Sequence, residues 1–275
     1  MLRFAVVGHP VAHSQSPQIH EQFAQQFDLD LSYERLLAPL DAFADCVEAF
    51  FAGGGSGLNV TVPFKGQAAQ WVTELDLSAR RAGAVNTIVS QSHGYRGYNT
   101  DGAGLVADLK QSFQLDLRGL RIAVLGAGGA AAGALGPLLA ETPARLVLAN
   151  RTLPKAQTLA AQFDGVEAVP YENLSGSFDL VINATSVGLA ATDQGFAAII
   201  EPAQLKGTRC YDMLYGPSAG FGDYAVAAGA VETADGLGML VEQAAAAFTL
   251  WLGLVPETGP VIAALRLVQE AVDDR

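Results

Sequence analysis

Residues 124–131 have the sequence VLGAGGAA, and this stretch decides the fold of the second half of the chain. Its Gly-rich part, 126–131, follows a predicted strand at 121–125 and opens an Ala-rich helical pattern, so a Gly-x-Gly-x-x-Ala pattern stands between a predicted strand and a predicted helix. Gly126 permits the tight turn, Gly128 lets the backbone approach a pyrophosphate, and Ala131 allows close helix packing. The stretch therefore predicts a Rossmann-type dinucleotide-binding domain.

The residues after the next predicted strand indicate which dinucleotide binds. An acid there would bind the ribose hydroxyls of NAD, but this chain has Asn150, Arg151 and Thr152, with Lys155 close behind. A guanidinium can hold a phosphate or stack on adenine, so this arrangement favours NADP as the cofactor. The alternative is that Arg151 is simply a solvated side chain at the start of a helix. Farther on, NATS at 183–186 ends another strand, where it either lines the cofactor path or forms a simple cap or turn.

Apolar runs and helical patterns alternate along the whole chain, which is typical of βαβ units. The first series places strands at 4–7, 33–37 and 59–62, helices at 17–27, 40–51 and 65–72, and a hairpin from 84–90 and 95–98. A second series has strands at 121–125, 145–149, 166–169, 178–183 and 208–212. Two helices, at 239–252 and 260–272, close the chain without a strand of their own.

This rhythm predicts an α/β protein of two domains. We expect a discontinuous N-terminal α/β substrate domain, residues 1–101 and 237–275, because the last helices must pack on a sheet elsewhere. Residues 102–236 form the expected dinucleotide-binding domain, with hinges near 99–104 and 235–238. A cleft between the two domains follows from this layout.

Composition narrows the partners. The 275 residues carry a net charge of -12, which disfavours nucleic acid and anionic membrane as partners. No apolar run is long enough for a membrane span and no signal peptide opens the chain. Cys46 and Cys210 lack metal-ligand spacing, so we expect no metal site and two reduced thiols in the cytoplasm. The sequence leaves monomer and homodimer open.

Residues 59–65, NVTVPFK, combine a packing side and a polar side if the chain stays extended. Asn59, Thr61 and Lys65 would then share the polar side, and Pro63 would end the strand or place it at an edge. Three further polar clusters follow predicted strands: HSQSP at 13–17, GAVNT at 83–87 and GYNTDG at 97–102. Ser16 and Asp101 are also plausible as helix caps. Together the clusters suit a small polyhydroxylated anion better than an apolar ligand.

Nine motifs in order resemble the shikimate dehydrogenase family. They are SQSP at 14–17, NVTVPFK at 59–65, GAVNT at 83–87, NTDG at 99–102, GAGGA at 126–130, NRT at 150–152, NATS at 183–186, YDMLY at 211–215 and DGLGMLVEQAA at 235–245. The resemblance covers nearly the whole chain. It implies NADPH-dependent reduction of 3-dehydroshikimate to shikimate, on the route to the aromatic amino acids.

The resemblance also implies residue roles. Lys65 and Asp101 would be the catalytic pair and would also touch the substrate. Its carboxylate would bind Ser14, Ser16 and Tyr215, and its ring hydroxyls would bind Asn59, Thr61, Asn86 and Gln243. The cofactor would be held by Gly126, Ala127, Gly128, Gly129, Ala130, Asn150, Arg151, Thr152, Lys155, Ala184, Thr185, Ser186, Met213, Gly236 and Met239.

The chain departs from the family pattern at two places. Members often carry Arg shortly after the Gly-rich turn, where this chain has Ala131 and Ala132, so phosphate binding would depend more on Arg151. After Tyr215, the sequence GPSAG replaces a common Thr-Pro, which leaves the cofactor contacts of the 216–222 loop open.

Three other functions share some of these sequence features. A quinate or mixed quinate/shikimate dehydrogenase, with broader substrate or NAD use, shares the catalytic pair, although Ser16 and Arg151 favour shikimate with NADP. A hydrolase is suggested by GPSAG at 216–220, but all four histidines precede Ser218, contrary to the order of an α/β-hydrolase triad. A non-catalytic NADPH sensor would not need Lys65 and Asp101 together.

Overall fold

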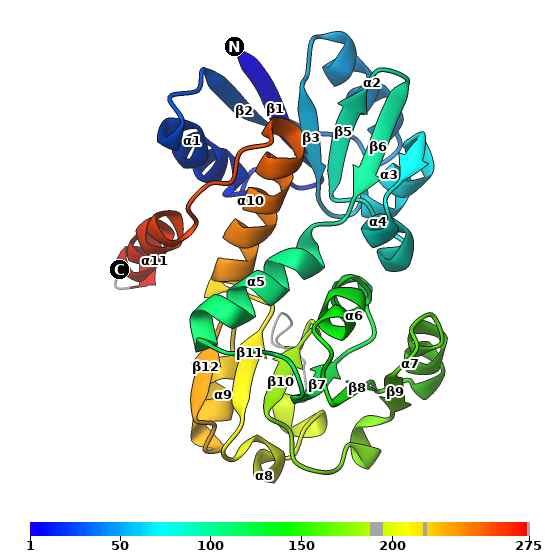
Figure 1. Ribbon diagram of the computed structural model, residues 1–275, viewed down its shortest axis with the longest axis vertical. Coiled ribbons are helices and arrows are strands. Elements are labelled where there is room, and N and C mark those ends of the chain that lie inside the picture. Colours follow the sequence, from blue (N-terminus) through cyan, green and yellow to red (C-terminus); the bar gives the residue numbers. More distant parts are fainter. Residues whose placement is uncertain (188–194, 217–218, 274–275) are drawn as a thin grey trace. The chain divides into compact units, whose positions relative to one another are not determined.

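Two six-stranded sheets carry the described residues, which are 1–187, 195–216 and 219–273 of a computed structural model (Figure 1). Packing divides the chain into two compact units, the first made of Met1–Gly104 with Val241–Arg275 and the second of Leu105–Leu240. Both changes of unit fall within a helix, α5 (Asp101–Phe113) and α10 (Leu237–Leu252). The expected domain limits, after residues 101 and 236, lie at the starts of these helices. Residues 101–104 and 237–238 are therefore helical, so the expected hinges are only partly loops.

In the first unit, strands and helices alternate along the chain before α5. Its elements are β1 (Leu2–Gly8), α1 (Ser16–Gln26), β2 (Leu31–Leu37), α2 (Phe43–Ala52), β3 (Gly57–Val60), α3 (Lys65–Trp71), β4 (Glu74–Leu75), α4 (Leu77–Ala82), β5 (Thr87–Gln91), β6 (Gly94–Tyr98) and, at the end of the chain, α11 (Gly259–Asp273). The strand order is β2-β1-β3-β5-β6-β4. β5 and β6 pair antiparallel, which confirms the predicted hairpin, while β1 pairs parallel with both β2 and β3.

The segment 59–65 differs from its prediction. β3 ends at Val60, and it is an inner strand of the sheet. The Phe64 amide donates to the Thr61 carbonyl oxygen in a turn, and Lys65 begins α3. As a result Phe64 is buried while Val62 is 59% exposed, so the two do not share a packing side. The predicted alternation past residue 60 is wrong, because the turn at the proline rotates the side chains away from strand periodicity.

The second unit is an all-parallel sheet. Its remaining elements are β7 (Arg121–Leu125), α6 (Gly129–Ala140), β8 (Arg145–Ala149), α7 (Leu153–Ala160), β9 (Val166–Val169), η1 (Tyr171–Asn173), β10 (Leu180–Asn183), η2 (Phe196–Ala198), α8 (Pro202–Leu205), β11 (Arg209–Asp212), α9 (Phe221–Ala227) and β12 (Glu232–Ala234). The strand order β12-β11-β10-β7-β8-β9 reverses direction between β7 and β10. This is the doubly wound order of a Rossmann fold, and it confirms the predicted α/β class.

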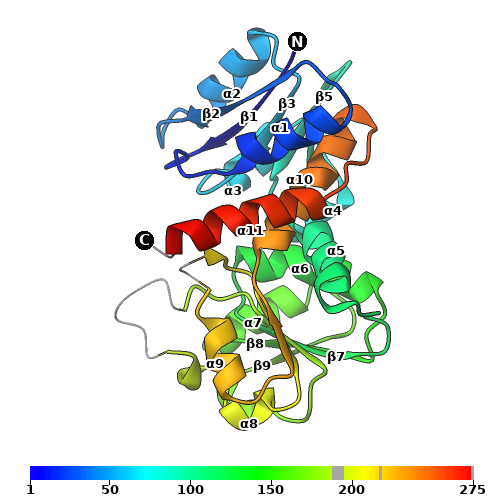
Figure 2. The same ribbon diagram turned by 90° about the vertical axis from the view of Figure 1, so that its left-hand side faces the viewer.

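Strand alternation gives each sheet two apolar faces. In the second unit, one face packs on α5, α6 and α7, and the other on η2, α8 and α9 (Figure 2). In the first unit, one face packs on α2, α3 and α4. The opposite face carries Phe4, Val6 and Tyr33, and it packs on Trp251 of α10. Parallel strands buried on both faces explain the continuous apolar runs in the sequence.

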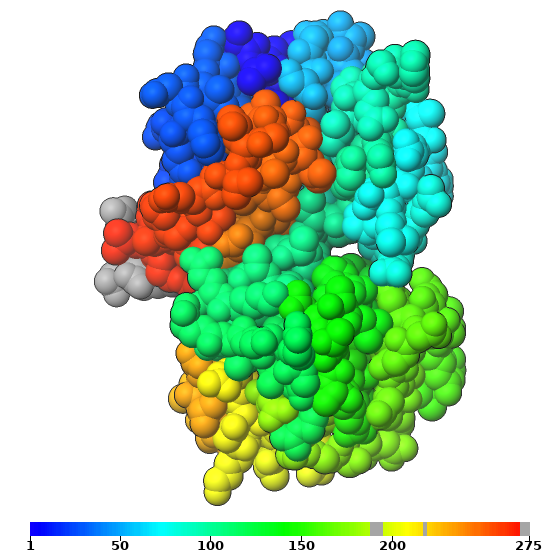
Figure 3. Space-filling view, viewed as in Figure 1, coloured from blue at the N-terminus to red at the C-terminus, as the bar shows by residue number. Residues whose placement is uncertain are grey.

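The C-terminal residues complete the first unit. The Gln26 side chain donates to the Glu257 carbonyl oxygen (2.9 Å), and the Trp251 indole N–H donates to the Ile88 carbonyl oxygen (3.0 Å). The surface in Figure 3 shows α11 beside the N-terminal residues of this unit. The chain end therefore packs on the sheet formed by the chain start.

Two further observations concern composition. Cys46 and Cys210 are both free thiols, and burial raises the pKa of Cys210 to about 12. Among the described residues, no helix combines the length and apolar character that crossing a membrane would require.

Candidate active site

A lysine and an aspartate form the chemical centre of the first unit. Lys65 and Asp101 are the first residues of α3 and α5. The Lys65 Nζ lies 2.6 Å from Asp101 Oδ2, and the two side chains are 30% and 19% exposed. The pair is thus formed within the protein and still open to a ligand, as its predicted role requires.

Asn86 connects this pair to α10. Its Nδ2 donates to Asp101 Oδ1 (2.8 Å) and Thr100 Oγ1 (2.9 Å), and it lies 3.4 Å from Gln243 Oε1. Its Oδ1 accepts from the Thr100 amide at 2.9 Å. Since the amide has only two N–H hydrogens for three acceptors, the long contact to Gln243 is the one that a substrate hydroxyl can replace. Asn86, Asp101 and Gln243, predicted separately, form one network.

Asn59 lies deeper, behind Asn86. Its Oδ1 accepts from the Tyr33 hydroxyl at 2.7 Å, and its Nδ2 donates to the Asn86 carbonyl oxygen and to Thr87 Oγ1, both at 3.1 Å. Both N–H hydrogens of this buried amide are therefore used within the protein. Asn59 can meet a ring hydroxyl only through its oxygen.

Ser14 and Ser16 lie together in the turn before and at the start of α1. Ser14 Oγ lies 3.1 Å from Ser16 Oγ and accepts from the Ser16 amide at 3.3 Å. Gln15 occupies the N-cap position, so Ser16 is not the helix cap considered from the sequence. Arg35, on β2, donates from Nε and Nη2 to the Ser14 carbonyl oxygen at 2.8 and 2.6 Å. Two hydroxyls held side by side suit a carboxylate.

Two predicted substrate residues lie apart from this network. The Thr61 amide donates to the Val7 carbonyl oxygen. The Thr61 side chain lies against Gly8, since a Cβ added to Gly8 would come within 2.4 Å of Thr61 Cγ2. Tyr215 belongs to the second unit, and burial raises its pKa. Their contacts with substrate stay predictions.

The Gly-rich turn joins β7 to α6 in the second unit. Gly126 has φ +101°, and a Cβ there would come within 2.9 Å of Thr185 Cγ2, so no other residue fits. Gly128 precedes α6, and in the described part of the chain no atom lies within 4 Å of a Cβ built on it. Packing does not demand glycine there, whereas approach of a phosphate to the helix amides does. Ala131 is fully buried in the core, as predicted.

A cavity of about 320 Å³ lies at the carboxyl ends of β7, β8 and β10. Ten of the fifteen predicted cofactor residues line it: Gly126, Ala127, Gly128, Asn150, Arg151, Thr152, Lys155, Ala184, Thr185 and Ser186. Thr185 Oγ1 and its amide both donate to Asn183 Oδ1, which fixes the loop after β10. The cavity sits where the strand order reverses, the usual ligand position in such sheets.

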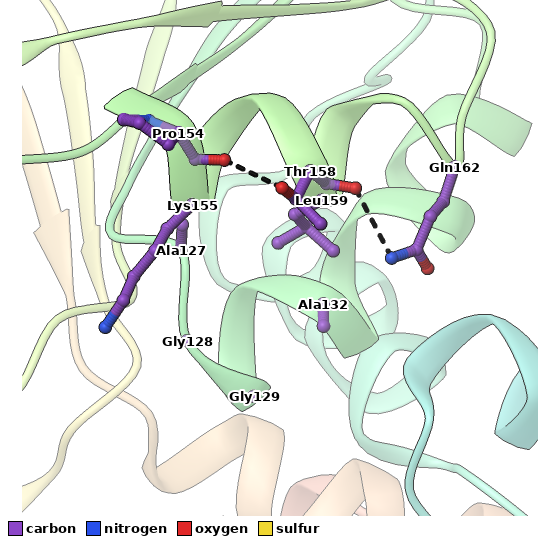
Figure 4. A pocket seen from close by; sticks show the side chains of 9 residues that line it. All are labelled: Ala127, Gly128, Gly129, Ala132, Pro154, Lys155, Thr158, Leu159 and Gln162. Atoms are coloured by element: carbon purple, nitrogen blue, oxygen red, sulfur yellow. Dashed lines mark hydrogen bonds between the residues drawn. The ribbon is translucent and has the colours of Figure 1, made fainter. Parts of the chain in front are cut away.

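A second cavity, of about 450 Å³, opens between α6 and α7 (Figure 4). Gly129 and Ala132 line it from α6, and Thr158 and Gln162 from α7 and the residues just after it. Lys155 lines both cavities, and Figure 4 shows its side chain extending from α7 along the Gly-rich turn. Lys155 is therefore placed to reach an anion at either cavity.

Four predicted cofactor residues line neither of these two cavities: Ala130, Met213, Gly236 and Met239. Met213 and Gly236 lie together, since a Cβ on Gly236 would come within 2.4 Å of the Met213 carbonyl oxygen. Met239, on α10, is partly buried and packs against the core of the second unit, as Met213 does. Their cofactor roles stay predictions. Pro217 and Ser218, in the hydrolase-like motif, lie outside the described residues.

Three residues of these sites were missed by sequence reasoning. Thr100 lies inside the NTDG motif, but its hydroxyl connects Asn86 to Gln243. This connection could not be predicted, because Gln243 lies on α10, far along the chain. Tyr171 lines the first cavity; burial raises its pKa and the nearby Arg151 charge lowers it. Arg35 belongs to none of the motifs, and no sequence pattern around a single arginine in a strand would mark it as part of a site.

The comparisons with known proteins agree with these sites. Family models match residues 6–88 as a shikimate dehydrogenase substrate binding domain, 108–203 as shikimate / quinate 5-dehydrogenase and 236–266 as a shikimate 5'-dehydrogenase C-terminal domain.

Near full-length relatives agree as well. The chain is 53% identical to a shikimate dehydrogenase (NADP(+)) of Aeromonas salmonicida over 272 residues, 97% of this chain and 98% of the relative. It is 48% identical to the same enzyme of Alkalilimnicola ehrlichii over 268 residues, covering 96% and 98%. A Thermus thermophilus shikimate 5-dehydrogenase, solved with NADP(H) and shikimate, is 34% identical with a TM-score of 0.82, covering 97% and 99%. The resemblance found in the nine motifs is thus confirmed, and the chain belongs to the shikimate dehydrogenase family.

Proposed function

We propose that this chain catalyses the reversible, NADPH-dependent reduction of 3-dehydroshikimate to shikimate, with Lys65 and Asp101 as its catalytic pair. The observation that carries the proposal is the 2.6 Å ion pair between them, set in a network of neutral amides and hydroxyls. Such a network suits a polyhydroxylated ring, because each hydroxyl needs both a donor and an acceptor.

Lys65 acts as the proton donor in the reducing direction. When NADPH is bound, its nicotinamide supplies a hydride to the carbonyl carbon. The Lys65 ammonium gives a proton to the carbonyl oxygen, which becomes the new hydroxyl. Because the Lys65 side chain is 30% exposed, solvent can return that proton after turnover.

Asp101 keeps the ammonium aimed and binds a neighbouring substrate hydroxyl. Oδ2 accepts from Lys65 and Oδ1 accepts from Asn86, so both oxygens are fixed in direction before substrate binds. This fixed orientation reduces the entropy cost of bringing the donor to the reacting oxygen.

The remaining groups divide by chemistry. Ser14, Ser16 and Tyr215 bind the substrate carboxylate, and the ring hydroxyls meet Asn59, Thr61, Asn86 and Gln243. Residues 1–101 with 237–275 serve as the substrate domain and 102–236 as the cofactor domain.

NADP is the cofactor that the second unit fits. Gly126 and Gly128 bring the α6 amides to the pyrophosphate, and the cavity beside them is lined by two cations, Arg151 and Lys155. Among the described residues that line this cavity, none is an acid that would bind the ribose hydroxyls of NAD. Relatives about half identical to the chain are named for NADP(+), which supports the same choice.

A quinate/shikimate dehydrogenase is the second candidate, since one matching family model is named for both substrates. Oxidation of shikimate and of quinate, each with NADP and with NAD, separates the two when the absorbance of the reduced cofactor is followed. We expect the highest kcat/KM for shikimate with NADP. Equal values for quinate would establish the broader activity, and no turnover with any pair would refute both.

A further inference from the structure

Arg35 holds the turn that carries Ser14 and Ser16. Its side chain starts on β2, which pairs with β1 such that Arg35 lies beside Val6. Tyr33 and Arg35 are two residues apart, so they point to the same face of the sheet, where α1 packs. Arg35 follows Tyr33 toward the carboxyl end of β2, which brings its guanidinium to the turn before α1.

Two donors of one guanidinium meet a single backbone oxygen there. Nε and Nη2 lie 2.8 and 2.6 Å from the Ser14 carbonyl oxygen. The Ser14 amide donates to the Val11 carbonyl oxygen at 3.1 Å, so the peptide groups on both sides of Ser14 are fixed. The two serine hydroxyls, 3.1 Å apart, depend on this peptide orientation for their direction. Arg35 thus determines where they point.

Among the described residues, no acid neutralises the charge of Arg35. In the described residues no carboxylate lies within 4.0 Å of its guanidinium, whereas the neighbouring Glu34 pairs with Arg3. Among the proposed substrate residues Lys65 is the one cation, and Asp101 is paired with it. The serine pair is itself uncharged. An anionic substrate group at Ser14 and Ser16 therefore has Arg35 as its adjacent positive charge, in a chain whose net charge is -12.

We infer that Arg35 is a positioning residue for the substrate carboxylate: it orients the Ser14 to Ser16 turn and supplies the positive charge that favours an anion there. The inference rests on the proposed function, because it takes Ser14 and Ser16 as the carboxylate site. By this inference, a residue on β2 contributes to the specificity of the carboxylate site.

The test compares shikimate with its methyl ester, which keeps the ring but lacks the charge. Arg35→Met removes charge and donors but keeps most of the aliphatic stem, and Arg35→Lys keeps the charge. We expect Arg35→Met to raise KM for shikimate about tenfold, equivalent to about 1.4 kcal/mol, with kcat within about twofold. Binding of the methyl ester, measured as competitive inhibition, should change far less. Arg35→Lys should retain most of the preference for the acid.

Arg3→Met is the matched control. Arg3 is likewise an arginine of this sheet whose side chain donates to a backbone carbonyl oxygen, that of Gly53 at 2.6 Å, but it is half-buried and lies at the start of β1. The Arg3→Met variant should bind shikimate and its methyl ester as the unmodified protein does. Thermal unfolding of each variant shows that the fold is retained.

Each outcome is decisive. If Arg35→Met weakened shikimate and its methyl ester equally, or left both unchanged, Arg35 would have no role in selecting the carboxylate. Ser14→Ala and Ser16→Ala, measured in parallel, separate this from the proposed function. If the serine variants raised KM while Arg35→Met did not, only the inference would fail. If the serine variants had no effect, the carboxylate assignment and the inference would fall together.

Discussion

At the scale of single residues, the chemistry depends on a few side chains that come from distant parts of the chain. Lys65 and Asp101 are 36 positions apart, and the turn after β3 and the start of α5 bring them to 2.6 Å. Asn86, at the beginning of the hairpin, orients the carboxylate. The ion pair is partly exposed, so it adds little to stability, and its proposed role is to place a proton.

Lys65→Ala should lower kcat by about 10²- to 10⁴-fold, the usual contribution of a general acid or base, while NADP affinity persists. Lys65 belongs to the first unit and the Gly-rich turn to the second, so removal of the ammonium should not alter that turn. The matched control is Lys110→Ala, which breaks another Lys–carboxylate pair, with Glu141 at 2.7 Å. Steady-state rates and a fluorescence titration with NADPH measure both effects. A Lys65→Ala variant with more than half the normal rate would exclude Lys65 as the proton carrier.

Arg151→Ala should weaken NADP by about ten- to a hundredfold and NAD much less, because a hydrogen bond between a guanidinium and a phosphate contributes about 1.5 to 3 kcal/mol. Added salt should weaken NADP binding to the unmodified protein more than to the variant, since it screens the contact that was removed. Arg118→Ala removes the same charge from an exposed site and is the control. Dissociation constants for both cofactors decide the matter. Equal losses for NADP and NAD would make Arg151 an adenine support and leave the phosphate to other groups such as Lys155.

Much of the geometry of the candidate site could be predicted from the sequence, because motif residues lie next to the turns that position them. Lys65, Asp101 and the Gly126 turn are of this kind. Arg35, Thr100 and Tyr171 were missed because their importance arises from partners on other elements. Such long-range pairings have no local pattern in a single sequence.

At the scale of elements, period-2 and helical patterns predicted most strands and helices but not every boundary. The strand expected through residue 62 ends at Val60, because a turn at Pro63 interrupts it and α3 begins at Lys65. β4 and β12 were not predicted: with two and three residues, they are too short to show alternation. The pairing of strands depends on tertiary packing, so the full strand order came only from the structure.

Helices α5 and α10 approach so closely in the first unit that one position of α5 must be glycine. A Cβ on Gly104 would come within 2.6 Å of the backbone nitrogen of Gln243 and within 2.9 Å of its Cα. Backbone atoms cannot yield as a side-chain tip does, so an added methyl must separate the helices and displace Gln243 from Asn86 and Thr100.

Gly104→Ala should therefore lower stability by about 1 to 3 kcal/mol and raise KM for shikimate, even though alanine favours helix formation. Gly66→Ala is the matched control, since Gly66 is also helical, and in the described residues no atom lies within 4 Å of a Cβ built there. It should be neutral or stabilising. Thermal unfolding of both variants distinguishes them. A Gly104→Ala protein as stable as the Gly66→Ala protein would show that α5 and α10 can move apart at little cost.

At the scale of the whole molecule, we expect one buried polar side chain of the first unit to make stability depend on pH. The first unit buries an imidazole: His20 has no exposed surface, and its ring stacks on Tyr33 at 4.4 Å, with Phe23, Phe248 and Trp251 around it. Among the described residues, neither ring nitrogen has a partner in hydrogen-bond geometry. A neutral ring tolerates this environment, whereas a charged ring would lose its hydration without compensation.

Burial lowers the pKa of His20 from its ordinary 6.5 to about 3, and this effect outweighs the opposing influence of the nearby Asn59 side chain. The unfolded chain therefore takes up a proton below about pH 6.5 that the folded chain refuses until about pH 3. The stability contributed by neutral His20 is complete above pH 6.5 and is lost as pH falls through this window, by about 1.4 kcal/mol per pH unit. Burial raises the pKa of Tyr33, the titratable group stacked on the ring, so Tyr33 does not titrate there.

His20→Phe should remove this acid sensitivity while keeping an aromatic ring in the cluster. We expect the free energy of unfolding to fall less steeply in the variant than in the unmodified protein between about pH 6.5 and about pH 4.5, whatever the offset at neutral pH. Both tryptophans, Trp71 and Trp251, lie in the first unit, so urea unfolding followed by tryptophan fluorescence reports on the unit that holds His20. His93→Asn, in the exposed hairpin turn, is the control and should keep the steep profile. Parallel profiles for His20→Phe and the unmodified protein would mean that the buried imidazole accepts a proton in the fold, and that acid sensitivity arises elsewhere.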